Sequence, residues 1–255
     1  MTFTAGLLNV VLGLAYTTYG LITIVDLKRG WKTMGFSHFG AAWIAMAFTC
    51  GPHHLVHGTH LLFEGRMAGP LDLVAVAVGL PAGVVFLSLR AEATLGGRGD
   101  RFISGSPLWL RSLPTLAATY ITILVVAVLR MSTYGLPDKV TPNIALIVLY
   151  FMIGYFLLRT QLRNRGVTQG WSASGVALTV VFPTCGLMHG VFALYAATGL
   201  YHDVDWHGLT IDWLAVPAAV YFLWVVRSLY RRSIRDWNRK MFDTVADTRA
   251  VVVTV

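Results

Sequence analysis

Two apolar stretches decide the fold: residues 37–63, SHFGAAWIAMAFTCGPHHLVHGTHLLF, and residues 171–199, WSASGVALTVVFPTCGLMHGVFALYAATG. Both contain the tripeptide Thr-Cys-Gly, followed after two further residues by a histidine. The chain has only two cysteines, Cys50 and Cys185, and both lie in this motif, with His54 and His189 as its histidines. Each stretch is long enough to cross a lipid bilayer as a helix.

Further apolar stretches recur along the whole chain of 255 residues, separated by short charged segments. Hydrophobic residues make up 56% of the sequence and charged residues 13%, which argues against an ordinary soluble domain. We therefore expect an all-α integral membrane protein with seven transmembrane helices. The expected spans are 4–26, 37–63, 71–91, 108–130, 142–162, 171–199 and 209–230.

The formal net charge of +8 is distributed unevenly between the two sides of these spans. Lysines and arginines follow spans one, three, five and seven, whereas segments 64–70, 131–141 and 200–208 contain only Arg66 and Lys139. The positive-inside rule then predicts an amino terminus outside and a carboxyl terminus in the cytoplasm. We expect a multi-pass protein of a bacterial-type inner (plasma) membrane, whose basic residues contact the lipid bilayer rather than nucleic acid.

The two motif-bearing stretches match beyond the motif itself. Residues 36–54 and 171–189 agree, without a gap, at seven of nineteen positions, and similar segments begin at Pro81 and Pro217. This predicts a duplication in which two parallel three-helix repeats are joined by a connector helix, a 3+1+3 arrangement. The expected parts of the single domain 1–240 are repeat A (4–91), the connector (108–130) and repeat B (142–230), followed by a cytoplasmic tail (241–255).

In topology, this arrangement resembles the PQ-loop families that export sugars and amino acids, and the microbial rhodopsins in outline. The resemblance to rhodopsins implies no retinal here, because no lysine lies within any expected span to form the Schiff base. Fold analogy alone does not assign a function. A functional hypothesis therefore depends on the chemistry of the motif residues.

Span two carries four histidines close to Cys50: His53, His54, His57 and His60. At about 100° per residue, these five side chains fall within an arc of roughly 120°. Span six offers sulfur instead, from Cys185 and Met188, next to His189. Both spans run outward from the cytoplasm, so we expect a site between them, in the outer half of the bilayer.

Three functional hypotheses fit these residues, beside the structural one that a buried cysteine or histidine only packs helices together. Haem iron fits axial ligation by His54 and His189, with Met188 as an alternative ligand. A bare transition metal (iron, copper or zinc) fits two sets of donors. They are Cys50, His54, Cys185 and His189, or else His53, His57 and His189, with His60 nearby.

Haem, iron or copper would serve membrane redox chemistry, as an oxidoreductase or an electron-transfer subunit, and this is the expectation that we favour. Three histidines around zinc would instead suit a catalytic site with an open position, as in hydrolases. The third hypothesis is a transporter for a small molecule or a metal ion, with its cavity between the repeats. No acidic residue lies in the middle of any expected span, which argues against a metal transporter. Because so few acids are available, we also expect other membrane subunits or a homo-oligomer as partners.

Overall fold

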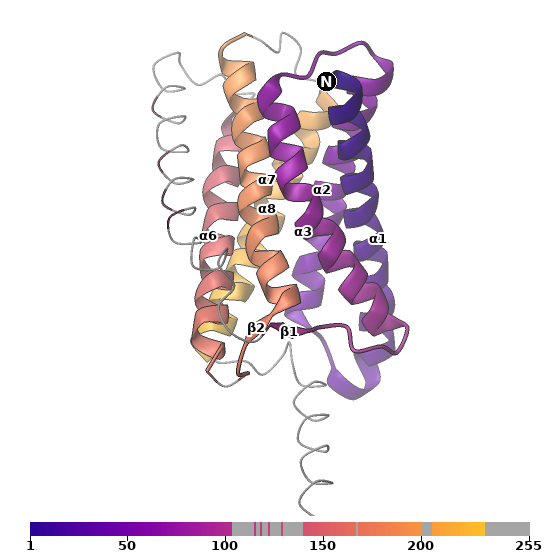
Figure 1. The fold of residues 1–255 in the computed structure, drawn as a ribbon. Coiled ribbons are helices and arrows are strands. Elements are labelled where there is room, and N and C mark those ends of the chain that lie inside the picture. The colour runs from indigo at the N-terminus through magenta and orange to yellow at the C-terminus, as the bar shows by residue number, and fades with distance from the viewer. Residues whose placement is uncertain are drawn as a thin grey trace, which may run out of the picture.

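The computed structural model describes residues 1–103, 140–166, 168–199 and 206–232, together with Thr115, Ala118, Thr122 and Leu129. These residues form upright helices that stand side by side (Figure 1). The helices are α1 (Thr2–Met34), α2 (His38–Phe63), α3 (Pro70–Thr94), α6 (Thr141–Asn164), α7 (Ala173–Ala197) and α8 (Trp206–Arg232). Two short strands, β1 (Phe102–Ile103) and β2 (Trp171–Ser172), pair antiparallel where α7 begins.

The predicted all-α class is confirmed, and the structure is helical at every expected span that falls on described residues. Five of these helices, α1, α3, α6, α7 and α8, are long and apolar enough to cross a membrane. Helix α2, which carries the four histidines, has 26 residues and is not among these five. The expected connector 108–130, apart from the four single residues above, and the tail 241–255 lie outside the described residues.

Equivalent serines start α2 and α7. The hydroxyl oxygen of Ser37 accepts a hydrogen bond from the Gly40 amide at 3.2 Å, and that of Ser172 accepts one from the Gly175 amide at 2.9 Å. Serine is a favoured residue at this position because its oxygen satisfies an amide that has no partner within the helix. The two motif-bearing helices therefore begin at matching points of the sequence.

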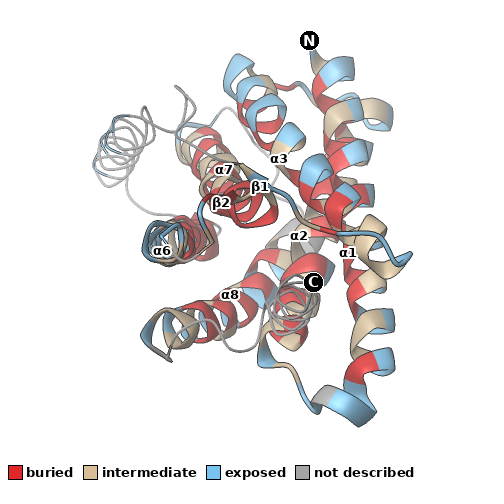
Figure 2. Ribbon diagram, turned by 60° about the horizontal axis from the view of Figure 1, so that its bottom comes forward, coloured by how far each residue is buried: buried red, intermediate tan, exposed pale blue. Residues whose placement is uncertain are grey.

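The helices form a closed ring, which we call the six-helix ring. Its main contacts run from α1 to α2, α8, α6, α7 and α3, and then back to α1. Figure 2 shows this order from one end, with the buried residues on the inner sides of the helices and the exposed residues outside. The exposed outer residues include many large apolar ones, as expected of helices that face lipid.

The contacts of the first three helices are repeated by the last three. Helix α1 packs against α2 and α3, and α6 packs in the same way against α7 and α8. The contacts between the two halves of the chain also correspond, since α3 packs on α7 and α8 packs on α2. Each half of the described chain thus contributes three consecutive helices to the six-helix ring.

Aromatic side chains fill one end of the ring. The indole of Trp43 on α2 meets the phenyl rings of Phe86, Phe182 and Phe222, with ring centroids 5.2, 5.8 and 5.6 Å away. These four rings come from α2, α3, α7 and α8, and the edge-on packing of Trp43 against the other three is a preferred geometry of aromatic pairs. The motif histidines of α2 lie about 15 Å further along that helix, so the apolar core and the polar residues occupy different levels.

Glycines bring α1 and α2 unusually close together. A β-carbon added at Gly13 would lie 2.8 Å from the Gly51 carbonyl oxygen and 2.9 Å from the Leu55 amide nitrogen. At Gly58 it would lie 2.9 Å from the Gly6 carbonyl oxygen. Small residues that allow backbones to touch are the usual means of joining helices in a membrane, where apolar side chains gain little by leaving lipid.

Candidate functional site

The structure buries both motif histidines and gives each one an asparagine partner. His54 and His189 are only 4% and 5% exposed. The Nδ1 atom of His54 lies 2.8 Å from Oδ1 of Asn9 on α1, and that of His189 lies 2.6 Å from Oδ1 of Asn143 on α6. The two halves of the chain therefore repeat one hydrogen bond between corresponding helices.

The other bonds of these asparagines indicate which histidine nitrogen carries the hydrogen. The side-chain amide of Asn9 donates to the Ala5 carbonyl at 2.9 Å, and that of Asn143 donates to Asp212 Oδ2 at 2.8 Å. Each Oδ1 is therefore the acceptor, and the histidine Nδ1 is the donor. A neutral imidazole in this state keeps a lone pair on Nε2, the form in which histidine binds metals.

Asp212 joins His53 and His189 in a compact cluster, which we call the His–Asp cluster. One potential ligand atom from each of the three residues lies within 4.8 Å of the other two. The Asp212 Oδ1 atom is 2.9 Å from His53 Nδ1 and 3.7 Å from His189 Nδ1. In the described part of the chain, this is the one group of three or more such residues with that spacing.

Two atoms of the cluster are close but badly aligned. His53 Nδ1 and Asp212 Oδ1 are both buried, and neither makes a hydrogen bond of acceptable geometry, although they are 2.9 Å apart. Leaving a buried polar atom without an aligned partner costs about 1–3 kcal/mol, and a bound ion is one arrangement that removes this cost. A cation placed between them would satisfy both, since each offers a lone pair.

The two cysteines lie elsewhere, in contact with tyrosines. The Cys50 sulfur is 3.0 Å from the Tyr150 hydroxyl oxygen, and the Cys185 sulfur is 3.4 Å from the Tyr16 hydroxyl oxygen. Tyr150 also connects the thiols to the cluster, because its ring centroid lies 5.4 Å from that of His189. We call these four residues the thiol–tyrosine group.

The remaining residues predicted from the sequence lie around these two groups. His57 is half-buried on α2, one turn beyond His53, and does not belong to the His–Asp cluster. His60 faces Glu64, with 3.5 Å between its Nε2 atom and the carboxylate. Met188 packs against an apolar cluster that includes Val191. The structure thus brings His53 and His189 together and places the other predicted ligands around them.

Sequence reasoning missed Asp212 and the tyrosine and asparagine partners. A signal for four of them exists, because residues 9–16 and 143–150 share the pattern Asn-x-x-Leu-x-x-x-Tyr. This pattern extends the duplication into the first helix of each repeat. Asp212 has no such signal, since the matching position of the first half, 136 residues earlier, is Val76.

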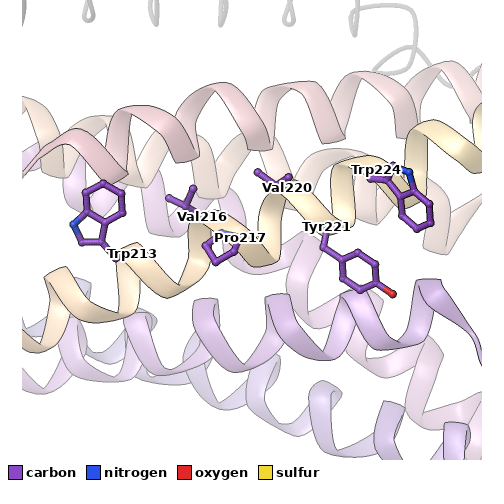
Figure 3. Close-up of a pocket in the computed structure, with 6 residues that line it drawn as sticks. All are labelled: Trp213, Val216, Pro217, Val220, Tyr221 and Trp224. Atoms are coloured by element: carbon purple, nitrogen blue, oxygen red, sulfur yellow. The ribbon is translucent and has the colours of Figure 1, made fainter.

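A surface groove lies away from all of these residues. It is an open, apolar groove of about 710 Å³ along the outer side of α8 (Figure 3). Its lining residues are Trp213, Val216, Pro217, Val220, Tyr221 and Trp224. Neighbouring residues of a helix point about 100° apart, so Asp212, which is 1% exposed, faces the ring interior while Trp213, 50% exposed, lines the groove.

Comparison of the chain with protein-family models, with curated proteins and with solved structures found no match. The assignment of a function therefore depends on the chemistry of the His–Asp cluster and of the residues that hold it.

Proposed function

We propose that this chain is a multi-pass membrane protein that binds one divalent transition-metal ion at His53, His189 and Asp212 for redox chemistry. The observation that carries this proposal is the 4.8 Å grouping of two imidazoles and one carboxylate, with two buried atoms that lack aligned partners. Two histidines and a carboxylate with open positions form the typical ligand set of non-haem Fe(II). Iron is therefore the ion that we propose.

The surroundings of the cluster support a resident ion. Asn143 binds both His189 Nδ1 and the Asp212 carboxylate, and hydrogen bonds of this kind hold the ligands of a metal in position. Asp212 neutralises part of the charge of a divalent ion inside the ring, where an unpaired charge would be expensive. The bound ion would supply one-electron chemistry, and the protein would fix its ligands and keep water away from it.

A bare ion suits this arrangement better than haem. Haem ligation by His54 and His189 requires a flat macrocycle between their imidazoles. The imidazole of His53 contacts both of these rings, with centroids 5.9 and 4.9 Å away. A single ion needs no such space, because its ligand atoms are already neighbours.

We further propose that the chain arose by duplication and lies in the inner (plasma) membrane with its amino terminus outside. The matching serine caps, the matching helix contacts and the repeated Asn–His and Tyr–Cys pairs support the duplication. The uneven distribution of lysine and arginine in the loops supports the orientation. In this 3+1+3 arrangement, the site belongs to both repeats, since His53 comes from one and Asp212 from the other.

Metal analysis of the purified protein tests the proposed function. We expect about one equivalent of iron per chain after dialysis, and no Soret absorption band. Less than about 0.2 equivalents each of iron, copper and zinc, again without a Soret band, would remove every resident-metal hypothesis. A Soret band that shifts on reduction by dithionite would instead identify haem.

A matched pair of substitutions separates the two metal hypotheses. His189→Ala removes a ligand of the proposed site, so we expect metal content to fall below about 0.1 equivalents. His54→Ala removes the corresponding histidine of the other repeat, which the His–Asp cluster does not use, and should leave more than about 0.8 equivalents. Equal loss in both variants would contradict the cluster and favour axial ligation by the pair.

His38→Ala is the control for a general effect of losing a histidine from α2. His38 lies at the opposite end of the helix, where its Nδ1 atom is 2.8 Å from the Tyr221 hydroxyl oxygen. We expect the iron content of this variant, measured by mass spectrometry, to equal that of the unmodified protein. A loss of iron in His38→Ala would mean that the iron content of the variants depends on correct folding and not on the loss of a metal ligand.

Transport of a divalent cation through the same cluster is the second candidate function. A carboxylate that is 1% exposed inside a ring of membrane-type helices favours it, because intramembrane acids often mark ion pathways. Pro52, Pro81, Pro183 and Pro217 lie inside four of the helices and provide points where these can bend. Uptake of iron into proteoliposomes, followed with a fluorescent indicator, together with loss of the ion on dialysis, would support transport over a resident ion.

A further inference from the structure

The thiol–tyrosine group brings together side chains from four helices and from both halves of the chain. Cys50 on α2 contacts Tyr150 on α6, and Cys185 on α7 contacts Tyr16 on α1. The side chains of α2 and α7 meet on both sides of the cysteines: Trp43 lies 5.8 Å from Phe182, and His53 lies 4.9 Å from His189, between ring centroids. The two thiols therefore lie at one level of the ring, and each contacts a hydroxyl from the opposite repeat.

Burial and partners distinguish these thiols from cysteines that only fill space. Cys185, Tyr16 and Tyr150 are 4%, 5% and 0% exposed, so the group lies within the core. A space-filling cysteine needs no hydrogen-bond donor. A thiolate does, and a hydroxyl that donates to sulfur is a typical neighbour of a metal-bound cysteine.

We propose that Cys50 and Cys185 bind one soft monovalent metal ion, of the Cu(I) or Ag(I) class, through two thiolates. Soft sulfur ligands select Cu(I) over borderline divalent ions. Two sulfur atoms suffice for linear coordination of such an ion, whereas structural zinc is almost always held by four ligands. In the described residues the thiols belong to no group of three or more metal-binding side chains, which fits a two-ligand site.

The charges of this site balance through proton release. Binding converts two neutral thiols into two thiolates and releases two protons, and the monovalent ion leaves a net charge of −1 on the pair. The Tyr16 and Tyr150 hydroxyls stabilise that charge by donating hydrogen bonds to the sulfur atoms. This site is distinct from the His–Asp cluster, which offers nitrogen and oxygen to a divalent ion, and its existence does not depend on the proposed function.

Binding of Cu(I) by the reduced, full-length protein in detergent tests the proposal, with Cu(I) supplied from a competing chelator. We expect about one equivalent in the unmodified protein and less than about 0.1 in Cys50→Ser and Cys185→Ser. Tyr16→Phe and Tyr150→Phe keep both thiols and should weaken binding by roughly 10–100-fold. Full Cu(I) binding by either serine variant, or none by the unmodified protein, would overturn the site.

Two further measurements distinguish the thiol site from a folding defect and from the proposed iron site. Asp212→Asn leaves both thiols intact, so it should keep its equivalent of Cu(I) even if it loses iron. X-ray absorption at the copper edge of the unmodified protein should show two sulfur neighbours. Nitrogen neighbours would contradict the thiol site and place the ion at the histidines.

Discussion

Replacement of Asp212 by asparagine is expected to remove nearly all bound iron from the purified protein. The substitution preserves the shape of the side chain and its ability to accept a hydrogen bond from Asn143, which donates to the carboxylate at 2.8 Å. It removes the one anionic ligand of the cluster. Since loss of a residue that only orients a ligand lowers metal affinity roughly 10–100-fold, we expect the loss of a ligand to lower it by more than about 100-fold. Iron content after dialysis and titration with Fe(II) measure the effect.

Asp72→Asn is the matched control, because it makes the same chemical change at another buried acid. Asp72 is 8% exposed and lies in the first turn of α3, where its carboxylate accepts a hydrogen bond from the Gly69 amide at 2.7 Å. We expect this variant to keep its iron. Retention of iron by Asp212→Asn, or equal loss in both variants, would show that the carboxylate of Asp212 is not a ligand.

Gly13→Ala is expected to destabilise the six-helix ring strongly. The new β-carbon would lie 2.8 Å from the Gly51 carbonyl oxygen and 2.9 Å from the Leu55 amide nitrogen. Backbone atoms cannot rotate away, so the two helices would have to separate. We expect a loss near the upper end of the range for overpacking, about 3 kcal/mol, or a fall of roughly 6–12 °C in the thermal midpoint. Thermal unfolding in detergent measures it.

Gly166→Ala makes the same change at a site with open space, where an added β-carbon meets no atom within 4 Å. Its thermal midpoint should stay within about 2 °C of the unmodified protein. Similar midpoints for the two variants would mean that α1 and α2 adjust to the methyl group without cost. The iron content of Gly13→Ala should also fall, because α2 carries His53 and its displacement from α1 alters the cluster.

The helices were predictable from the sequence because apolar runs of sufficient length have few other solutions in lipid. The ends of the helices were harder to predict. The first helix was expected to end at residue 26 and continues to Met34, through Lys28, Arg29 and Lys32. Lysine and arginine are good helix formers, so the helix has no reason to stop where the apolar run does. Length and helical type follow from hydropathy, whereas the ends depend on local residues.

The site was predictable in part, because rare residues repeat. Cysteine and histidine stood out in apolar helices and located α2 and α7 as its centre. Asp212 was not recognised, since it lies near one end of the expected span 209–230, where an acid is ordinarily hydrated. Only the packing of α8 against α2 and α6 shows that its carboxylate is buried beside His53. Contacts between distant helices depend on tertiary packing, which periodicity does not encode.

The closed order of the helices has a mechanical consequence. A helix at the edge of an open bundle can tilt and disturb a single neighbour, but each of the six described helices has a neighbour in the ring on both sides. If α8 moves away from α2, it must also shift against α6, and the displacement passes on through α7 and α3 to α1. A change in the spacing between α8 and α2 at Asp212 is therefore expected to reach the opposite side of the ring, where α7 meets α3.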